Sequence, residues 1–454
     1  MPASWFVSSP LLRPTSAPPR SRSSWRSRAA LSLLAVAGLL AWQVAVAGAA
    51  HPKGGVLDPS FGVGGKVTTQ FDSGFDQATA LVVQGDKLVV AGSGGDGDFA
   101  LARYSLDGSL DPTFGAGGRV KTDFGPADQA SALVMQGDRL VAAGFTLTFT
   151  ETSLDVALAR YQPDGSLDPN FGAGGQVITD FGGDDRATAA VALPGGKLVV
   201  AGFTISFAGQ PDVILARYNL DGSLDSSFGA GGKVITNVPG IEEAFALAVQ
   251  PDGKLVVAGI AGPLGFGDLN QNFALARYNA DGSLDSGFGT EGTVETDIGG
   301  RTNDQANALV VLANGKLVAA GTAAEISGSS DAALARYNAD GTLDRMFGPG
   351  GTVRTDIGSG DFDEAKALAV QADGRLVIAG FAVTEGNFDF ALARYKFNGG
   401  LDRSFGVGGT VRTDFSGSTD SAAALAIQAD GKLVAAGFAV IGGDADFAIA
   451  RYVP

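Results

Sequence analysis

The hexapeptide Phe-Ala-Leu-Ala-Arg-Tyr at residues 99–104 recurs in seven variants, and each copy ends at one of the seven tyrosines of the protein. Consecutive copies are 57, 57, 60, 59, 58 and 57 residues apart, ending at Tyr104, Tyr161, Tyr218, Tyr278, Tyr337, Tyr395 and Tyr452. This period suits a four-stranded propeller blade with long loops better than it suits a helical repeat. The sequence therefore predicts seven structural units of one kind.

Four short apolar segments, separated by glycine-rich turns, make up the first unit. They span residues 78–84, 87–91, 99–104 and 119–124, and we name them strands A, B, C and D. They are apolar on both faces, which is typical of sheets covered on both sides. With 68 glycines and few helix-favouring runs, the pattern predicts an all-β, seven-bladed β-propeller of four-stranded blades.

Strand C is expected to present a large and a small face. Alternation assigns Phe99, Leu101 and Arg103 to one face and Ala100, Ala102 and Tyr104 to the other. A large face that meets a small face suits blades stacked at close packing density.

Three sequence elements recur along the chain: ALAVQPDGKLVVAG, as at residues 246–259, FALARYNADGSLD, as at residues 273–285, and SFG-x-GG. In these elements, residues 57–454 resemble the bacterial delta-60 repeat family, a β-propeller of unknown function. The arrangement of each unit is also loosely similar to an NHL-type blade. The resemblance implies the fold and gives no activity.

The two ends of the repeat region complement each other. The region begins with a D-type segment, residues 57–71, and ends on a C-type strand, residues 447–452. We expect residues 66–71 to pair with that strand and complete the last blade, whose A and B strands are expected at 423–428 and 432–436. Such pairing closes the ring and removes an exposed sheet edge.

An arginine recurs in every strand C, where its guanidinium needs a carboxylate partner if it is buried. A D-strand acid is present in five units, as Asp123, Asp180, Asp297, Asp356 and Asp414, but Gln70 and Asn237 replace it in the other two. The aspartate of Leu-Asp occurs in all seven. We therefore expect structural pairs such as Arg103 with Asp111, Arg160 with Asp168 and, through ring closure, Arg451 with Asp58. The functional alternative is a ring of arginines that binds an anion in the channel.

The first fifty residues differ from the rest of the chain. Five arginines precede an uncharged run at 29–50 that is rich in Leu, Ala and Val. Residues 1–50 are therefore expected to be a signal peptide, or else an uncleaved anchor, followed by a short tail at 51–56 and the propeller at 57–454. The predicted location is outside the cell or in the envelope or periplasm, without membrane insertion if the signal is cleaved.

Charge and composition limit the kinds of partner that this protein can be expected to bind. Residues 51–454 contain 27 basic and 48 acidic side chains, a net charge of −21. Nucleic acid and anionic membranes attract basic patches, so we expect neither as a partner. The chain has no cysteine, so no disulfide framework supports the fold. We expect a monomer.

The B–C loops are the most variable parts of the repeat. From the glycine that ends strand B to the arginine of strand C there are 11, 16, 15, 18, 15, 14 and 14 residues, so units two to five carry the long insertions. Variable loops on a rigid scaffold often bind ligands. The candidate binding residues are Phe149, Glu151, Phe207, Asp212, Phe266, Asp268, Asn270 and Gln271. The alternative is that these are tolerated surface insertions.

The sequence offers little support for a metal site or a catalytic site. The only histidine is His51, and cysteine is absent, which excludes Ser-His-Asp and Cys-His chemistry in the propeller and leaves zinc and copper poorly provided for. No catalytic residue, metal site or cofactor is assigned. Calcium is the alternative, because acids cluster at Asp96 with Asp98, Asp184 with Asp185, Asp361 with Asp363 and Asp444 with Asp446, but no EF-hand pattern occurs.

Three functional hypotheses follow. The first is a secreted, non-catalytic binding module that engages a protein or a surface polymer through the variable loops. The second is an extracellular hydrolase or lyase that uses carboxylates, although all three tryptophans lie in the first fifty residues, so the propeller lacks the indole platforms common in sugar sites. The third is a structural cell-surface protein.

Overall fold

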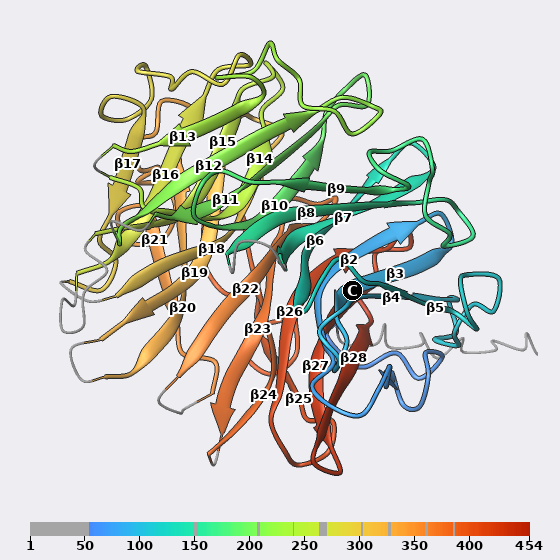
Figure 1. Cartoon of the computed structure of the whole chain (residues 1–454). Coiled ribbons are helices and arrows are strands. Elements are labelled where there is room, and N and C mark those ends of the chain that lie inside the picture. The colour runs from blue at the N-terminus through green and yellow to red at the C-terminus, as the bar shows by residue number, and fades with distance from the viewer. Residues whose placement is uncertain are drawn as a thin grey trace, which may run out of the picture. The chain divides into compact units, whose positions relative to one another are not determined.

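The computed structural model describes residues 54–148, 153–206, 209–238, 240–262, 270–300, 303–325, 328–358, 362–384 and 386–454. In these residues the chain forms seven four-stranded antiparallel sheets, the blades of a propeller (Figure 1). This confirms the predicted fold class. No helix in the described ranges is long and apolar enough to cross a membrane.

Each blade runs from an inner strand A to an outer strand D. Blades one to four are β2 (Gln77–Gln84), β3 (Lys87–Ser93), β4 (Phe99–Tyr104) and β5 (Arg119–Thr122); β6 (Asp128–Gln136), β7 (Arg139–Leu147), β8 (Leu154–Tyr161) and β9 (Gln176–Thr179); β10 (Asp184–Ala192), β11 (Leu198–Ile205), β12 (Pro211–Tyr218) and β13 (Lys233–Thr236); β14 (Glu243–Val249), β15 (Leu255–Ala261), β16 (Asn272–Tyr278) and β17 (Thr293–Thr296). Blades five to seven are β18 (Asp304–Val311), β19 (Leu317–Ala324), β20 (Ser330–Tyr337) and β21 (Thr352–Thr355); β22 (Asp363–Val370), β23 (Leu376–Thr384), β24 (Asn387–Tyr395) and β25 (Thr410–Thr413); β26 (Asp420–Ile427), β27 (Leu433–Ile441), β28 (Asp444–Tyr452) and β1 (Lys66–Thr69).

The ring closes as the sequence predicts. Strand β1 is antiparallel to β28, with Lys66 opposite Ala450 and Thr69 opposite Phe447. The last blade therefore takes three strands from the C-terminal end of the chain and its outer strand from residues before blade one (Figure 1).

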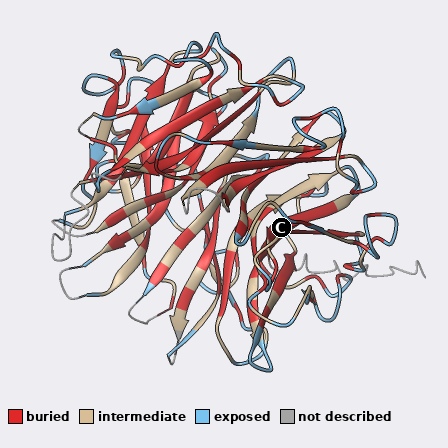
Figure 2. Ribbon diagram, viewed as in Figure 1, coloured by how far each residue is buried: buried red, intermediate tan, exposed pale blue. Residues whose placement is uncertain are grey.

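Apolar packing between blades forms the core. Seven clusters of buried side chains each join two neighbouring blades. Alternation on β4 is as expected, because Phe99 and Leu101 pack in the cluster shared with blade two, whereas Ala100, Ala102 and Tyr104 pack in the one shared with blade seven. Buried residues accordingly run along the strands, and exposed residues concentrate in the turns and loops (Figure 2).

Strand D is shorter than predicted. It was expected to reach Phe124 in blade one and Phe71 in the closing strand, but β5 ends at Thr122 and β1 at Thr69. The reason is local, because the N–H groups of Phe124 and Phe71 donate to the carboxylates of Asp128 and Asp76 and not to a neighbouring strand.

Some of the residues counted between strands B and C extend these two strands and do not form a loop. In blades six and seven the two strands pair as far as Thr384 with Asn387 and Ile441 with Asp444, so the connections are tight turns. In blade four pairing stops at Ala261 with Asn272, which leaves residues 262–271 as the connection. The fourth insertion is therefore the longest loop, as the residue count indicates.

Candidate functional site

The recurrent arginines lie in buried corners between strand C and the turn that follows it. Each arginine Nε donates to Oδ2 of the Leu-Asp aspartate at 2.6 to 3.0 Å, in all seven units. The pairs are Arg103 with Asp111, Arg160 with Asp168, Arg217 with Asp225, Arg277 with Asp285, Arg336 with Asp344, Arg394 with Asp402 and Arg451 with Asp58. Each guanidinium also lies 4.5 or 4.6 Å from the centroid of a phenylalanine ring of the same corner.

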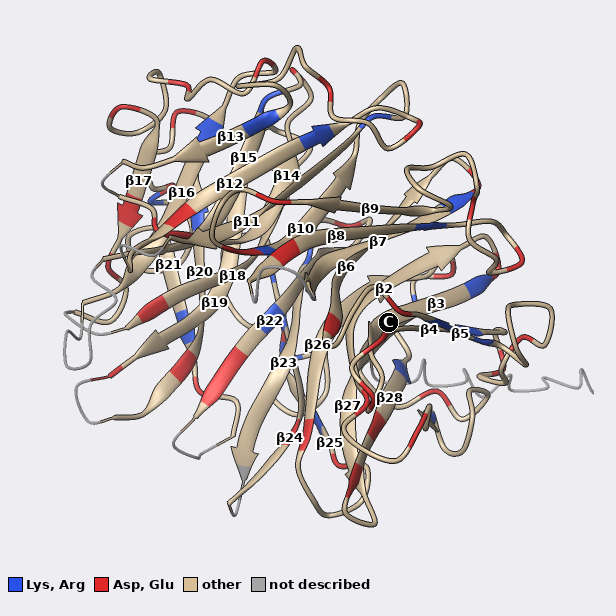
Figure 3. Ribbon diagram, in the orientation of Figure 1, with Lys and Arg blue, Asp and Glu red and all other residues tan. Residues whose placement is uncertain are grey.

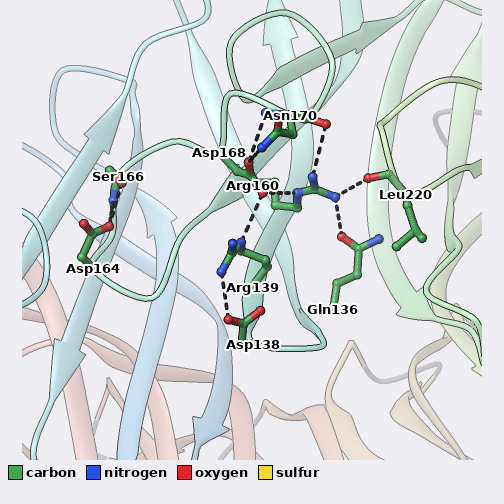
Figure 4. Close-up of polar contacts among 9 residues, drawn as sticks. All are labelled: Gln136, Asp138, Arg139, Arg160, Asp164, Ser166, Asp168, Asn170 and Leu220. Atoms are coloured by element: carbon green, nitrogen blue, oxygen red, sulfur yellow. Dashed lines mark hydrogen bonds and ion pairs between the residues drawn. The ribbon is translucent and has the colours of Figure 1, made fainter.

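The corner of blade two shows how these arginines connect blades (Figure 4). Arg160 donates to Asp168, to the Gln136 side chain at 2.9 Å and to the main-chain oxygen of Leu220, which belongs to the C–D turn of blade three. Equivalent contacts reach the next blade from Arg103 to Pro163 and from Arg451 to Leu106. Six of the seven arginines are buried, the Arg217 side chain is 11% exposed, and all seven are hydrogen-bonded, which fits a structural role and not an anion-binding ring in the channel.

A second cation, which the sequence analysis missed, completes each corner. The residue that begins or precedes strand B lies 2.5 to 3.7 Å from the same aspartate. These residues are Lys87, Arg139, Lys197, Lys254, Lys316, Arg375 and Lys432. The hydrogen bond from Lys254, with Arg277 beside it, lowers the pKa of Asp285 to about 2. The Lys or Arg that follows the A–B turn in all seven units could have indicated this partner.

Seven tyrosine–threonine hydrogen bonds link successive blades, and these too were not predicted. Each tyrosine hydroxyl lies 2.8 to 3.0 Å from the Oγ1 of the threonine that ends strand D of the preceding blade. The pairs are Tyr104 with Thr69, Tyr161 with Thr122, Tyr218 with Thr179, Tyr278 with Thr236, Tyr337 with Thr296, Tyr395 with Thr355 and Tyr452 with Thr413. Burial raises the pKa of all seven tyrosines, so they remain neutral hydrogen-bonding groups and cannot serve as bases near neutral pH.

Buried aspartates shape the opposite, loop-bearing face of the propeller. At the start of strand A in six blades, an aspartate Oδ2 accepts the N–H of the residue that follows strand D by two positions. These aspartates are Asp76, Asp128, Asp185, Asp304, Asp363 and Asp420, and none is more than 3% exposed. Burial raises the pKa of Asp185 and Asp363 to about 6 and that of Asp420 to about 7. These carboxylates hold the D–A loops in place.

Of the predicted binding residues, Asn270 and Gln271 lie in the B–C connection of blade four, whereas Asp212 lies in strand β12, opposite Thr204 of β11, and not in a loop as predicted. Phe149, Glu151, Phe207, Phe266 and Asp268 lie outside the described residues. Asn270 is exposed. Gln271 is partly buried, and its main-chain oxygen accepts the Asp304 N–H at 2.8 Å, which ties this loop to the adjacent D–A loop. Asp212 is partly buried beside Asn237, and burial raises the pKa of its carboxyl.

Three groups of aspartates could hold a metal ion among the described residues. Each group joins one residue from the start of strand C, one after strand D and one from strand A of the next blade: Asp98, Asp123 and Asp128; Asp155, Asp180 and Asp185; and Asp389, Asp414 and Asp420. Of the acids that the sequence analysis singled out, the structure places Asp98 and Asp185 in such groups. Figure 3 shows the acidic residues distributed over many loops and strand ends. Asp123, Asp180 and Asp414 were noted as D-strand acids, but their convergence with the other members was not predicted, because each group draws on two different repeats.

The face that carries the C–D turns has a different character. Four surface hollows of 550 to 670 Å³ repeat there, each between a strand D and the C–D turn or a terminal segment beside it. One of them, of about 670 Å³, is lined by residues such as Met346, Val353, Arg354 and Asn398. Because the hollows share glycine and strand D residues and gather no group of acids and bases, they reflect the repeat and do not indicate one dedicated site.

These features define a seven-bladed β-propeller with repeated structural corners on one face and unequal loops on the other. The chain belongs to the family described as "Domain of unknown function (DUF5122) beta-propeller", whose model matches residues 84–114, 136–171, 193–228, 250–288, 312–347, 371–405 and 428–454. A comparison with curated proteins gives no match.

Solved structures share the fold at low sequence identity. A polysaccharide lyase of family PL25, an ulvan lyase bound to -[GlcA(1-4)Rha3S]-, aligns with a TM-score of 0.51 and 11% identity over 86% of this chain and 95% of its own. Sqt1 from Chaetomium thermophilum aligns with a TM-score of 0.46 and 13% identity over 84% and 96% of the two chains. The polysaccharide lyase Uly1 aligns with a TM-score of 0.44 and 13% identity over 83% and 89%. These similarities concern the fold alone.

Proposed function

We propose that the protein is an exported, non-catalytic binding protein that engages a protein or a surface polymer through the B–C loops of blades two to five. The observation that carries this proposal is the inequality of the loops on one face. The B–C connection covers residues 262–271 in blade four but only residues 442–443 in blade seven. The opposite face repeats one corner seven times, so it offers a partner no distinct place to bind.

Export rests on the N-terminal segment. Five arginines followed by an uncharged run at 29–50 have the charge and hydropathy pattern of a secretory signal. The absence of cysteine is compatible with an oxidising compartment, where the interblade polar contacts and apolar clusters stabilise the fold without disulfides.

A carboxylate-dependent hydrolase or lyase is the second candidate. The ulvan lyase shares the fold, and carboxyl groups with a raised pKa, as in Asp185, Asp363 and Asp420, are the type that general acids require. In this chain, however, each of the three side chains is at most 1% exposed, and its Oδ2 is bound to a loop N–H. This burial keeps the groups from a substrate and favours the binding role. A structural cell-surface protein is the third candidate.

We also infer that the repeats are of the delta-60 type, a finer assignment than the family match. This inference rests on the recurrent ALAVQPDGKLVVAG and FALARYNADGSLD elements and on the SFG-x-GG corner.

The test replaces residues 262–271 with the two-glycine turn that Gly442 and Gly443 form in blade seven. Retention of the protein is measured on isolated cell envelopes and on a panel of extracellular polysaccharides. The control variant is Asp281→Asn, in an exposed turn of the repeated face. Loss of retention in the loop variant alone supports the proposal, whereas full retention removes blade four from the binding surface. Turnover of a polysaccharide or lactone by the unaltered protein would favour the enzyme.

A further inference from the structure

Three aspartates from two neighbouring blades converge at the loop-bearing face between blades two and three. Asp155 belongs to β8, Asp180 follows β9, and Asp185 belongs to β10 of the next blade. One carboxylate oxygen from each lies within 4.8 Å of the other two. Calcium–oxygen distances are about 2.3–2.6 Å, so ligands on opposite sides of one ion are separated by up to about 5 Å. We propose that these three aspartates bind a calcium ion that joins blades two and three.

A buried carboxylate oxygen of Asp185 that accepts no hydrogen bond supports this site. Asp185 is 0% exposed, and its Oδ2 accepts the Phe181 N–H. Its Oδ1 is buried and has no hydrogen-bond partner among the described residues. A buried carboxylate oxygen left without a partner is costly, and a cation on the same carboxyl group removes this cost.

In the described part of the chain, two of the three carboxylates also lack an ion-pair partner. No ion pair connects Asp180 or Asp185 to a lysine or arginine in the described part of the chain, and the Lys233 Nζ donates to the main-chain oxygen of Asp180. The three converging carboxylates therefore favour a bound positive charge.

The other two aspartate groups differ from this one because each has a lysine or arginine in the third position of its strand D. In the third position of strand D, blade one has Lys121 and blade six has Arg412, whereas blade two has Ile178, which is 48% exposed. Lys121 forms ion pairs with Asp72 at 2.9 Å and Asp98 at 3.5 Å. Burial and Asp414 raise the pKa of Asp389, and the positive charge of Arg412 opposes this rise. An amino-acid cation thus supplies the charge in those groups, and a metal ion would supply it beside Ile178.

Calcium is favoured over smaller or softer ions by the ligand chemistry. Carboxylate oxygens suit hard cations, and calcium accepts irregular geometry with water completing its six to eight ligands, whereas magnesium requires a near-ideal octahedron. Three carboxylates, one of them on an exposed residue, predict a dissociation constant of about 10⁻⁴ to 10⁻³ M, the range of extracellular calcium modules. The site does not depend on the proposed partner-binding role.

The experiment titrates the purified, EDTA-treated protein with calcium chloride at pH 7.5 by calorimetry and measures thermal unfolding with and without the ion. Asp185→Asn removes the central charge. Ile178→Lys introduces the cation that blade one has at this position. The matched control is Ile235→Lys, at the equivalent exposed position of blade three, where the described residues form no such group of aspartates.

We expect one calcium equivalent per chain and a higher unfolding temperature when calcium is present. Asp185→Asn and Ile178→Lys should each weaken binding at least about tenfold, because each lowers the negative charge of the site by one unit, whereas Ile235→Lys should bind as the unaltered protein does. If Asp185→Asn does not fold, Ile178→Lys decides the matter, since its side chain is on the surface. Absence of binding up to about 10 mM calcium, a range that includes the weakest extracellular modules, or unchanged binding in Ile178→Lys, overturns the proposal.

Discussion

Arg451 Nε donates to Asp58 Oδ2 at 2.9 Å across a sequence separation of 393 residues. The same guanidinium group donates to Ser60 Oγ at 3.0 Å and to the main chain of Leu106 in blade one. One buried arginine therefore connects the end of the chain, the closing strand segment and the first blade. In the other six units the equivalent arginine and aspartate are close in sequence. The Arg451–Asp58 pair instead joins the two ends of the repeat region and so stabilises ring closure.

Asp58→Asn should destabilise the protein by about 3–5 kcal/mol, because it leaves the charge of Arg451 buried without its carboxylate. Asp111→Asn removes the same interaction inside blade one and is the matched comparison. Guanidinium-induced unfolding measures both. If closure limits the cooperativity of the ring, Asp58→Asn also broadens the transition, whereas equal and sharp transitions in both variants would show that closure has no special role. Deletion of residues 57–71 should abolish cooperative unfolding altogether.

Tyr278→Phe should cost about 1–2 kcal/mol, since it leaves the buried Oγ1 of Thr236 without its partner across the interface of blades three and four. Thr236→Val should cost a similar amount. The double variant should cost less than the sum of the two, because neither polar group then remains unpaired. Additive losses in this double-mutant cycle would mean that the hydroxyl pair makes no coupled contribution.

The repeat and its closure are predictable because they depend on features that act within one unit. Phe99 and Ala100 alternate in the sequence and point into different interfaces in the structure. The pairing of Arg103 with Asp111 follows from the requirement that a buried charge have a partner in every unit.

The polar contacts between neighbouring blades could not be predicted from the sequence. The threonine partner of each tyrosine is about 40 residues earlier, in the outer strand of the preceding blade, and nothing in the local pattern distinguishes it from other strand threonines. The group of Asp155, Asp180 and Asp185 similarly requires the angle between two blades before it can be recognised. The residue count between strands B and C in blade six does not show that the two strands continue to pair as far as Thr384 and Asn387, because length alone does not distinguish strand from loop.

Gly259→Ala should destabilise the protein strongly, by about 3 kcal/mol or more, comparable to overpacking of a rigid core. A Cβ atom at this glycine would lie 1.8 Å from the main-chain oxygen of Glu243, at the bulge of strand A. The matched control is Gly287→Ala, whose Cβ would first meet Asp285 Oδ1 at 3.3 Å and whose position is Thr113 in blade one. Thermal unfolding compares the two. A small and equal effect of both changes would contradict the steric requirement for glycine at this position of strand B.

Asp420→Asn should flatten the pH dependence of stability between about pH 4 and pH 7. Burial raises the pKa of Asp420 to about 7, with Asp414 and Asp389 adding to the rise and Lys66 opposing it, whereas an aspartate in the unfolded chain titrates near pH 4. The folded state therefore holds this proton more tightly, so its contribution to stability is complete below about pH 4 and is lost as the pH rises through 7. Asp285, whose pKa is lowered to about 2, acts in the opposite direction, since its contribution is present above about pH 4 and is lost as the pH falls through 2.

The test compares unfolding temperatures at pH 5 and pH 8 in EDTA, which should differ less for Asp420→Asn than for the unaltered protein. The control Asp430→Asn, at an exposed position, should behave like the unaltered protein. A difference that is the same in all three proteins would show that Asp420 titrates as an ordinary surface carboxylate.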